Sequence, residues 1–201
     1  MKKIINQLLN LFGYSITRKK NFEKIYRTLD TTIRNLIKKE SPIMIDVGAH
    51  EGETINRFRK LFKSPIIHSF EPQNKCFKLL KKFEDENTFV NNYGLGDKKE
   101  IKKINILNQN SSSSIYNIDE NSTYSKELKV IEKQDIALDL LDNYLIDKKI
   151  DFVDVLKIDV QGYEDKVLKG AINSLGKKIY LVELEIIFID YYEKKKSFLE
   201  I

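Results

Sequence analysis

Short apolar runs alternate along the chain with segments whose apolar residues recur at helical spacing. Apolar runs of roughly four to eight residues, bounded by turn signals, are typical of strands buried on both faces. They predict strands at 43–47, 66–70, 88–93, 153–160 and 179–185. Helical spacing predicts helices at 54–62, around 77–83, at 137–145 and at 163–175, and a further helix that begins the segment 189–201. This alternation indicates an α/β fold with a parallel sheet covered on both faces.

The pattern weakens between Asp97 and Ile136. Apolar and polar residues alternate at 101–106, and the polar run at 108–114 is typical of a solvated loop. We find no internal repeat and no second globular domain. The chain is therefore expected to comprise a basic helical extension over 1–42 and one α/β domain over 43–201.

The extension concentrates the positive charge of the chain. Residues 1–42 hold ten Lys and Arg against three acidic residues, a net +7, which leaves −2 for the remainder. The apolar residues between Ile4 and Phe12 are interrupted by Asn and Gln, and no small-residue cleavage site follows, so an amphipathic helix is favoured over a targeting signal. The pattern favours a solvated helix covering one side of the domain. Contact with an anionic membrane surface, nucleic acid or an acidic substrate is the alternative.

Two further features bear on the compartment. No window reaches the roughly 18 consecutive apolar residues of a membrane span. Cys76 is the single cysteine, which excludes an internal disulfide and fits a reducing environment. We therefore expect a cytoplasmic protein with at most peripheral membrane contact.

The first candidate site follows the strand at 43–47, in the segment Asp46-Val47-Gly48-Ala49-His50-Glu51-Gly52. A strand that ends at glycines and enters a helix opens a cofactor crevice at the carboxyl edge of the sheet. Glu71 ends the next strand, where a carboxylate can accept hydrogen bonds from both hydroxyls of a ribose.

Two cofactors compete for this loop. A dinucleotide needs G-x-G-x-x-G around its pyrophosphate, but here the middle glycine is missing and two acidic residues stand near the pyrophosphate position. Acidic groups repel a polyanion but suit the sulfonium and amino group of S-adenosylmethionine, which Asp46 could hold directly or through water. His50 in the same loop is either a base or a residue that shapes the cofactor pocket, and the second role is favoured.

The second candidate site is the segment from Leu156 to Glu164, which again ends a strand and opens a helix. Asp159 is expected to face the same crevice, and Lys157 is unusual inside an apolar strand. Glu183 and Glu185 end the next strand, and at least one is expected to point into the crevice. Carboxylates gathered at one edge can orient and deprotonate a hydroxyl. His68, within a strand, is expected to be structural.

These segments together resemble the FkbM family of methyltransferases. The resemblance rests on IDVGAHEG, FEP, GLGD, the dipeptide Leu138-Asp139 and LKIDVQGYEDKVLKG, in this order, and covers roughly 43–185. It implies the class I fold, S-adenosylmethionine as the cofactor, and O-methylation of a hydroxyl on a sugar or a secondary-metabolite-like small molecule. It also implies cofactor contacts and reacting groups, which are Asp46, Gly48, Ala49, His50 and Gly52 at the methionine end, Glu71 at the ribose, Gly94, Leu95, Gly96 and Asp97 near the adenine, and Asp159, helped by Glu183, as catalytic residues. Serines 111–114 match a family stretch that faces the cleft.

The chain departs from the family pattern in two places. Gln161 stands where the family usually has glutamate, which puts a metal or base role there in doubt, and no metal site is predicted. A class I sheet continues with a helix and two strands after the position of Glu185, so we expect this sheet to lack its last strands. An exposed strand edge favours pairing between copies, which predicts a homodimer. The alternatives are a truncated, non-catalytic module that binds S-adenosylmethionine, or a nucleic-acid methyltransferase. No motif for a flipped base supports the latter, so no nucleic-acid partner is expected.

Overall fold

The structure, a computed structural model, describes residues 22–123 and 125–201. The chain divides into two units, residues 1–38 and 39–201. In the first unit, the described residues form helix α2 (Phe22–Leu36). The helix expected between Ile4 and Phe12 lies outside the described residues. Within the described part of the chain, no helix is long and apolar enough to cross a bilayer.

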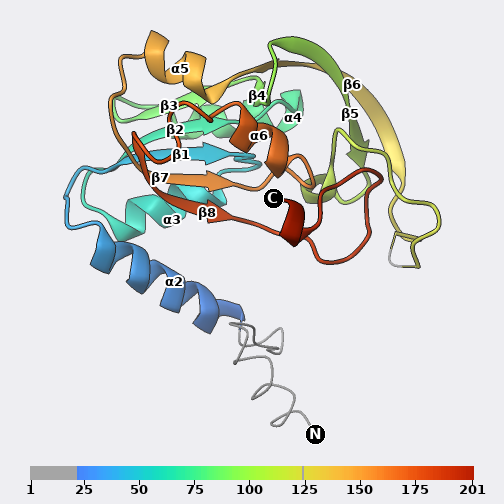
Figure 1. The fold of residues 1–201 in the computed structure, drawn as a ribbon, viewed down its shortest axis with the longest axis horizontal. Helices are drawn as coiled ribbons and strands as arrows, with labels where there is room; N and C mark the ends of the chain where they lie inside the picture. Colours follow the sequence, from blue (N-terminus) through green and yellow to red (C-terminus); the bar gives the residue numbers. More distant parts are fainter. Residues whose placement is uncertain (1–21, 124) are drawn as a thin grey trace, which may run out of the picture. The chain divides into compact units, whose positions relative to one another are not determined.

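The second unit is built on a five-stranded parallel sheet with strand order β3-β2-β1-β7-β8 (Figure 1). Its strands are β1 (Ile43–Val47), β2 (Ile66–Phe70), β3 (Thr88–Asn91), β7 (Val153–Ile158) and β8 (Ile179–Leu184). From β1 the chain proceeds outward to β2 and β3, and then returns to the other side of β1 as β7. The carboxyl ends of β1 and β7 therefore form the switch point at which open α/β sheets bind ligands. This topology confirms the expected doubly wound α/β fold.

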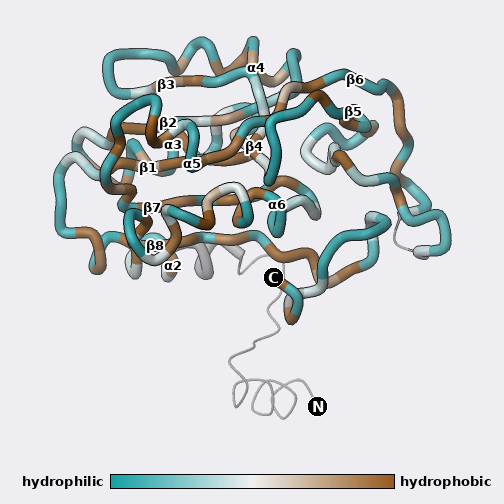
Figure 2. Tube along the Cα trace, turned by 45° about the horizontal axis from the view of Figure 1, so that its top comes forward, coloured by the Kyte–Doolittle hydropathy of each residue, from teal (hydrophilic) through white to brown (hydrophobic). Residues whose placement is uncertain are grey.

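Helices cover both faces of this sheet, as the alternating sequence pattern predicts. The helices are α3 (Glu53–Leu61), α4 (Asn74–Leu80) with the 3-10 turn η2 (Lys81–Phe83), α5 (Leu141–Asp147) and α6 (Glu164–Lys169). Figure 1 shows α5 and α6 on one side of the sheet and α3 on the other. Successive strand residues face opposite sides. The face toward α5 and α6 forms the main core, which includes Ile45, Val47, Phe70, Leu141, Leu145, Leu156, Ile158 and Val167. In Figure 2 these strands are largely brown, whereas the connecting loops are largely teal.

A second, three-stranded sheet occupies the region where no regular structure was expected. Its strands are β4 (Gly94–Leu95), β5 (Glu100–Leu107) and β6 (Val130–Asp139), in the order β4-β6-β5, and β5 and β6 pair antiparallel. Burial does not alternate regularly here, because residues 104–107 are all buried whereas residues 130–133 are all exposed, and the hydrophobic signal is therefore weak. The helix predicted at 137–145 is wrong in its first half, because Leu138 belongs to β6 and pairs with β4 and β5.

Two other predicted helices differ from the structure. The helix expected at 163–175 stops at Lys169, because the chain turns at Gly170 and the Asp142 carboxylate accepts hydrogen bonds from the Asn173 backbone N–H (2.9 Å) and the Ser174 hydroxyl. The helix expected from residue 189 onward is wrong. Tyr192 instead forms a β-bridge with Ile118, and the described residues after β8 add only the 3-10 turn η4 (Phe198–Glu200).

Candidate active site

The loop after β1 is held by the backbone of neighbouring strands. The N–H groups of Gly48 and Ala49 both donate to the Phe70 carbonyl, each at 3.0 Å. Gly48 has φ +82°, and a Cβ there would lie 1.8 Å from the carbonyl oxygen of Asp159. Glycine is therefore required by the close approach of the β7 end, independently of any ligand.

The loop enters α3 through a second constrained glycine. Gly52 has φ +97°, and a Cβ there would lie 2.3 Å from the Phe83 ring. His50 also has a positive φ of 47°, and its backbone N–H donates to Glu71 Oε2 at 2.9 Å. Its ring lies 3.7 Å from the Glu53 carboxylate and 3.4 Å from the Asn110 amide, so the side chain is positioned from two directions.

Glu71 is buried beside this loop, where the sequence predicts a ribose ligand. Its two carboxylate oxygens accept the backbone N–H groups of His50 (2.9 Å) and Gln73 (2.8 Å). Burial raises the pKa of Glu71 to about 7, although these two N–H groups oppose the rise. Each oxygen keeps a further lone pair, but only 3% of the residue is exposed. The structure thus gives Glu71 a clear role in joining β2 to the loop.

A row of polar side chains crosses the face of the sheet that carries α3. The strand register aligns Ser69, Asp46, Lys157 and Glu183 on four adjacent strands. Ser69 and Asp46 are fully buried, and neither the Ser69 hydroxyl nor either Asp46 carboxylate oxygen has a hydrogen-bond partner of good geometry. Burial raises the pKa of Asp46, and the charge of Lys157 opposes that rise.

Lys157 connects the loop after β1 to the end of β7. Its Nζ lies 3.3 Å from Asp46 Oδ1, 3.3 Å from the Gly48 carbonyl oxygen and 3.5 Å from Asp159 Oδ2. Burial lowers the pKa of Lys157, but the charges of Asp46 and Asp159 outweigh it and raise the pKa overall. The buried lysine that is unusual from the sequence is thus a charged group shared by two carboxylates.

Asp159 and Glu185 form a pair of carboxylates beyond the strand ends. Gln161 joins them, because its Nε2 donates to Asp159 Oδ1 at 2.8 Å and to Glu185 Oε2 at 2.9 Å. A hydrogen bond to Asp159, reinforced by partial burial, raises the pKa of Glu185 to about 8. Burial raises the pKa of Asp159, but Glu185 and Lys157 outweigh it, so the net pKa lies below the ordinary range. No three His, Cys, Asp or Glu side chains among the described residues converge as a metal-ligand group.

Glu183, the predicted helper of Asp159, is engaged elsewhere. Its two carboxylate oxygens each accept a hydrogen bond from the Arg57 guanidinium of α3, both at 2.7 Å. The side chains are only 13% and 16% exposed, respectively, so the pair is largely removed from water. Of the two glutamates that end β8, Glu185 rather than Glu183 contacts the network of Asp159.

The segment predicted near the adenine lies against α6. The Gly96 N–H donates to the Asp139 carbonyl at 2.9 Å, and Asp97 forms an ion pair with Lys166 at 2.9 Å. Burial raises the pKa of Asp97, but the hydrogen bond and charge of Lys166 outweigh it and the net pKa is lowered. Among the described residues, no hydrogen bond or ion pair joins Asp97 to Asp46 or Glu71.

The polar run at 108–114 reaches both halves of the site. Asn110, in the 3-10 turn η3 (Asn110–Ser112), donates to Cys76 Sγ at 2.9 Å and lies beside His50. At the other end, Ser114 Oγ donates to the Gln161 carbonyl at 2.7 Å. Tyr192 completes this arrangement, because its hydroxyl lies 2.6 Å from the Ser112 carbonyl and 3.2 Å from Gln161 Oε1. Neither Asn110 nor Tyr192 is distinguished in the sequence by a motif.

Glu164 and His68 have structural roles. Glu164 Oε1 accepts the backbone N–H groups of Val160 and Gly162, both at 3.1 Å, and so fixes the loop that carries Gln161. His68 Nδ1 lies 2.8 Å from the Tyr144 hydroxyl, and burial lowers the pKa of His68 to about 4.

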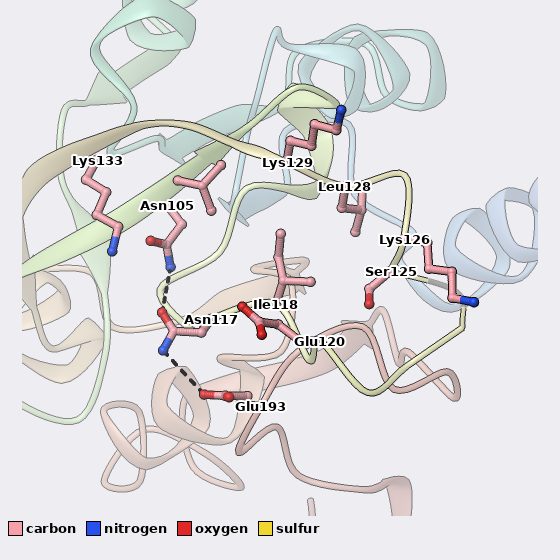
Figure 3. Close-up of a pocket in the computed structure, with 11 residues that line it drawn as sticks. Asn105, Asn117, Ile118, Glu120, Ser125, Lys126, Leu128, Lys129, Lys133 and Glu193 are labelled. Atoms are coloured by element: carbon pink, nitrogen blue, oxygen red, sulfur yellow. Dashed lines mark hydrogen bonds between the residues drawn. The ribbon is translucent and has the colours of Figure 1, made fainter.

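A cavity of about 580 Å³ lies beside the second sheet (Figure 3). Asn105 of β5 and Asn117 face it, with Asn105 Nδ2 3.4 Å from Asn117 Oδ1 and Asn117 Nδ2 3.3 Å from Glu193 Oε2. The other residues around it are Ile118, Glu120, Ser125, Lys126, Leu128, Lys129, Val130 and Lys133. Asp159 and the loop after β1 do not line this cavity.

Comparison of the sequence with models of known protein families identifies the family of this chain. The model of the methyltransferase FkbM domain matches residues 46–201, which is more than half of the chain. The chain belongs to the FkbM methyltransferase family. No curated protein and no solved structure matches the sequence significantly.

Membership in the FkbM family makes the chain a methyltransferase domain. The matched region includes the loop after β1, Glu71, the end of β7 and the Asp159–Gln161–Glu185 network. In this FkbM domain the loop predicted at the methionine end, the predicted ribose ligand Glu71 and the predicted catalytic residue Asp159 lie at neighbouring carboxyl ends of β1, β2 and β7.

Proposed function

We propose that this FkbM domain transfers the methyl group of S-adenosylmethionine to a hydroxyl of a sugar or a secondary-metabolite-like small molecule. The observation that carries the proposal is the carboxylate network at the switch point of the sheet. Asp159 is adjacent to the loop after β1, because its N–H donates to the Val47 carbonyl at 3.0 Å. A reactive hydroxyl beside Asp159 would thus lie next to the cofactor loop.

The residues of the loop fit a cationic methyl donor. Asp46 is a buried carboxylate 3.3 Å from Lys157 Nζ, and Glu71 and Asp159 add two further carboxyl groups at the same edge, so acidic groups outnumber the one lysine. A pyrophosphate would be repelled by these groups, whereas an ammonium and a sulfonium would be attracted. S-adenosylmethionine supplies, when bound, an electrophilic methyl group attached to positively charged sulfur.

The protein contributes positioning and proton transfer. Bringing two reactants together in the correct geometry can account for roughly 7–11 kcal/mol of a barrier. Asp159 is the proposed base, which accepts the hydroxyl proton as the oxygen forms its bond to the methyl carbon. Glu185 and Lys157 lower the pKa of Asp159 and so keep it ionised, and Lys157 also joins it to the Gly48 end of the loop.

The cofactor half of the proposal is tested by binding. Addition of millimolar S-adenosylmethionine or S-adenosylhomocysteine should raise the melting temperature, because a ligand that binds only the folded state stabilises it. NADH serves as a matched control and should produce no shift. A shift with NADH alone, or with none of the three, would contradict the proposal.

The reaction half is tested with a panel of sugars and small hydroxylated metabolites, by measuring S-adenosylhomocysteine release and the mass of the methylated product. Asp159→Asn should bind the cofactor as the wild type does and should lower turnover about 100-fold or more. Cofactor binding without transfer to any hydroxyl would support the non-catalytic module instead. Cytoplasmic location, the homodimer and the absence of a nucleic-acid partner remain predictions.

A further inference from the structure

The register of β7 and β8 places two glutamates opposite two residues of very different roles. Lys157 is the partner of Glu183 within the sheet, and two residues later Asp159 and Glu185 follow the ends of the same strands. The Glu185 N–H donates to the Ile158 carbonyl at 3.0 Å, which keeps the chain paired to this point. Glu183 is bound by Arg57 at both oxygens, whereas Glu185 accepts a hydrogen bond from the Gln161 amide, which also donates to Asp159.

The Gln161 side chain is fixed in an orientation that can bind two carboxylates. Its Nε2 donates to carboxylate oxygens of Asp159 and Glu185, which orients the amide, and its Oε1 lies 3.2 Å from the Tyr192 hydroxyl, which donates to the Ser112 carbonyl at 2.6 Å. The backbone of Gln161 is also fixed, with φ 56° and its carbonyl bound by Ser114. The two carboxylates are therefore held near each other around one amide.

The two carboxylates differ in exposure. The Asp159 side chain is 30% exposed, whereas Glu185 is exposed to solvent. The ionisable groups that act on Glu185 are Asp159 beyond β7, Lys157 of β7 and Glu164 of α6, and Tyr192 of the C-terminal segment lies on the other side of Gln161. Asp159 and Glu164 raise the pKa of Glu185 and Lys157 lowers it, with a net value of about 8.

We infer that Glu185 is the proton acceptor of Asp159, so that the hydroxyl proton leaves the site through this carboxylate pair to solvent. The inference rests on the proposed function. In the balanced step, the acceptor oxygen forms a bond to the methyl carbon, the carbon–sulfur bond breaks with its electron pair remaining on sulfur, and the hydroxyl proton passes to Asp159. The proton then moves to Glu185 and from Glu185 to water. Glu185 acts through Asp159 and does not touch the reacting atoms.

The pair should have a recognisable titration. When Glu185 is protonated, its proton is shared with Asp159, and the pair is a poor acceptor for a second proton. Methyl transfer should therefore rise with pH and level off above about pH 8. In Glu185→Gln the rise near pH 8 should disappear, and turnover at pH 9 should fall roughly tenfold, less than the 10²–10⁴-fold typical of a direct acid–base group.

Carbon-13 NMR of the side-chain carboxyls tests the pair without an acceptor substrate. In the full chain, the signals of Asp159 and Glu185 should shift together through a step near pH 8. Asp159→Asn should move the titration of Glu185 back toward the ordinary range, because the hydrogen bond to Asp159 is the largest cause of the raised pKa. Glu132→Gln, which removes an exposed carboxyl on β6, is the matched control and should alter neither readout.

The outcomes separate this inference from the proposed function. If the wild type transfers no methyl group to a hydroxyl, the proposed function fails, and this inference fails with it whatever the NMR titration shows. If transfer occurs and Glu185→Gln keeps the inflection near pH 8, or Glu185 titrates independently of Asp159, Glu185 is not the proton acceptor. Loss of the inflection with unchanged affinity for S-adenosylmethionine supports the inference.

Discussion

Replacement of Glu71 by glutamine should change how the stability of the domain depends on pH. Glu71 is 3% exposed, and burial raises the pKa of its carboxyl from 4.5 to about 7. The folded protein therefore retains a proton that the unfolded chain releases between about pH 4.5 and 7. Below this window both states are protonated, and above it both are ionised. The contribution of Glu71 to the free energy of unfolding thus falls as pH rises through the window.

The size of this effect follows from the shift. At about 1.4 kcal/mol per pKa unit, the rise to about 7 corresponds to roughly 3 kcal/mol lost between pH 4.5 and 7. Glu71→Gln is neutral at every pH and loses nothing across the window. The glutamine NH₂ leaves the His50 or Gln73 N–H without an acceptor, which costs about 1–3 kcal/mol independently of pH.

Urea denaturation at half-unit pH steps from 4 to 8 measures the difference between wild type and variant. The free energy of unfolding of the wild type minus that of Glu71→Gln should fall by roughly 3 kcal/mol between pH 4 and pH 7.5 and then stay constant. Glu86→Gln, which removes an exposed carboxyl before β3, should follow the wild type at each pH. A difference between wild type and Glu71→Gln that is constant from pH 4 to 8 would refute the reasoning, since it would mean that Glu71 titrates alike in both states.

Three further substitutions test the packing of the site. Phe58→Ala removes a fully buried ring from α3 and should cost about 3–5 kcal/mol of unfolding free energy in urea, whereas a loss under about 1 kcal/mol would mean that the ring is not close-packed. Gly48→Ala places a methyl group 1.8 Å from the Asp159 carbonyl oxygen, and the left-handed backbone conformation alone costs about 1–2 kcal/mol. Both the free energy of unfolding and the affinity for S-adenosylmethionine should therefore fall. If the variant retains both, the close approach of the two segments is contradicted. Glu183→Gln should cost about 1–3 kcal/mol by breaking the paired hydrogen bonds to Arg57, and a double-mutant cycle with Arg57→Met should show coupling, while strictly additive losses would exclude the ion pair.

The central sheet was predictable because its strands carry their own signal. Ile43–Val47 and Ile66–Phe70 are apolar runs buried on both faces, so local hydrophobicity and burial agree. The pair β5–β6 was missed because its burial follows no regular alternation, and its stability comes from pairing between residues distant in the chain. Propensity cannot report such pairing.

The residues of the candidate site were likewise predictable from the sequence only in part. Asp46, Glu71 and Asp159 could be placed at one edge because each directly ends or follows a strand, and parallel strands share their carboxyl edge. Glu183 was predicted as the helper of Asp159, but the structure binds it to Arg57 and brings Glu185 to Gln161, which depends on the register of β8 against β7 and on an arginine from α3. Tyr192 was missed for a related reason, since its hydroxyl meets Gln161 only after the C-terminal segment folds back beside residues 112–118.

The segment that carries β5 and β6 begins and ends at neighbouring positions in the fold. Glu100, at the start of β5, pairs with Leu138, near the end of β6, so the first and last residues of the segment 100–138 are neighbours in the sheet. A segment with neighbouring ends can be replaced as a cassette with little effect on loop closure. Grafting this segment from another FkbM protein would change most of the lining of the cavity in Figure 3 while leaving β1, β7 and the carboxylates of the switch point in their native sequence.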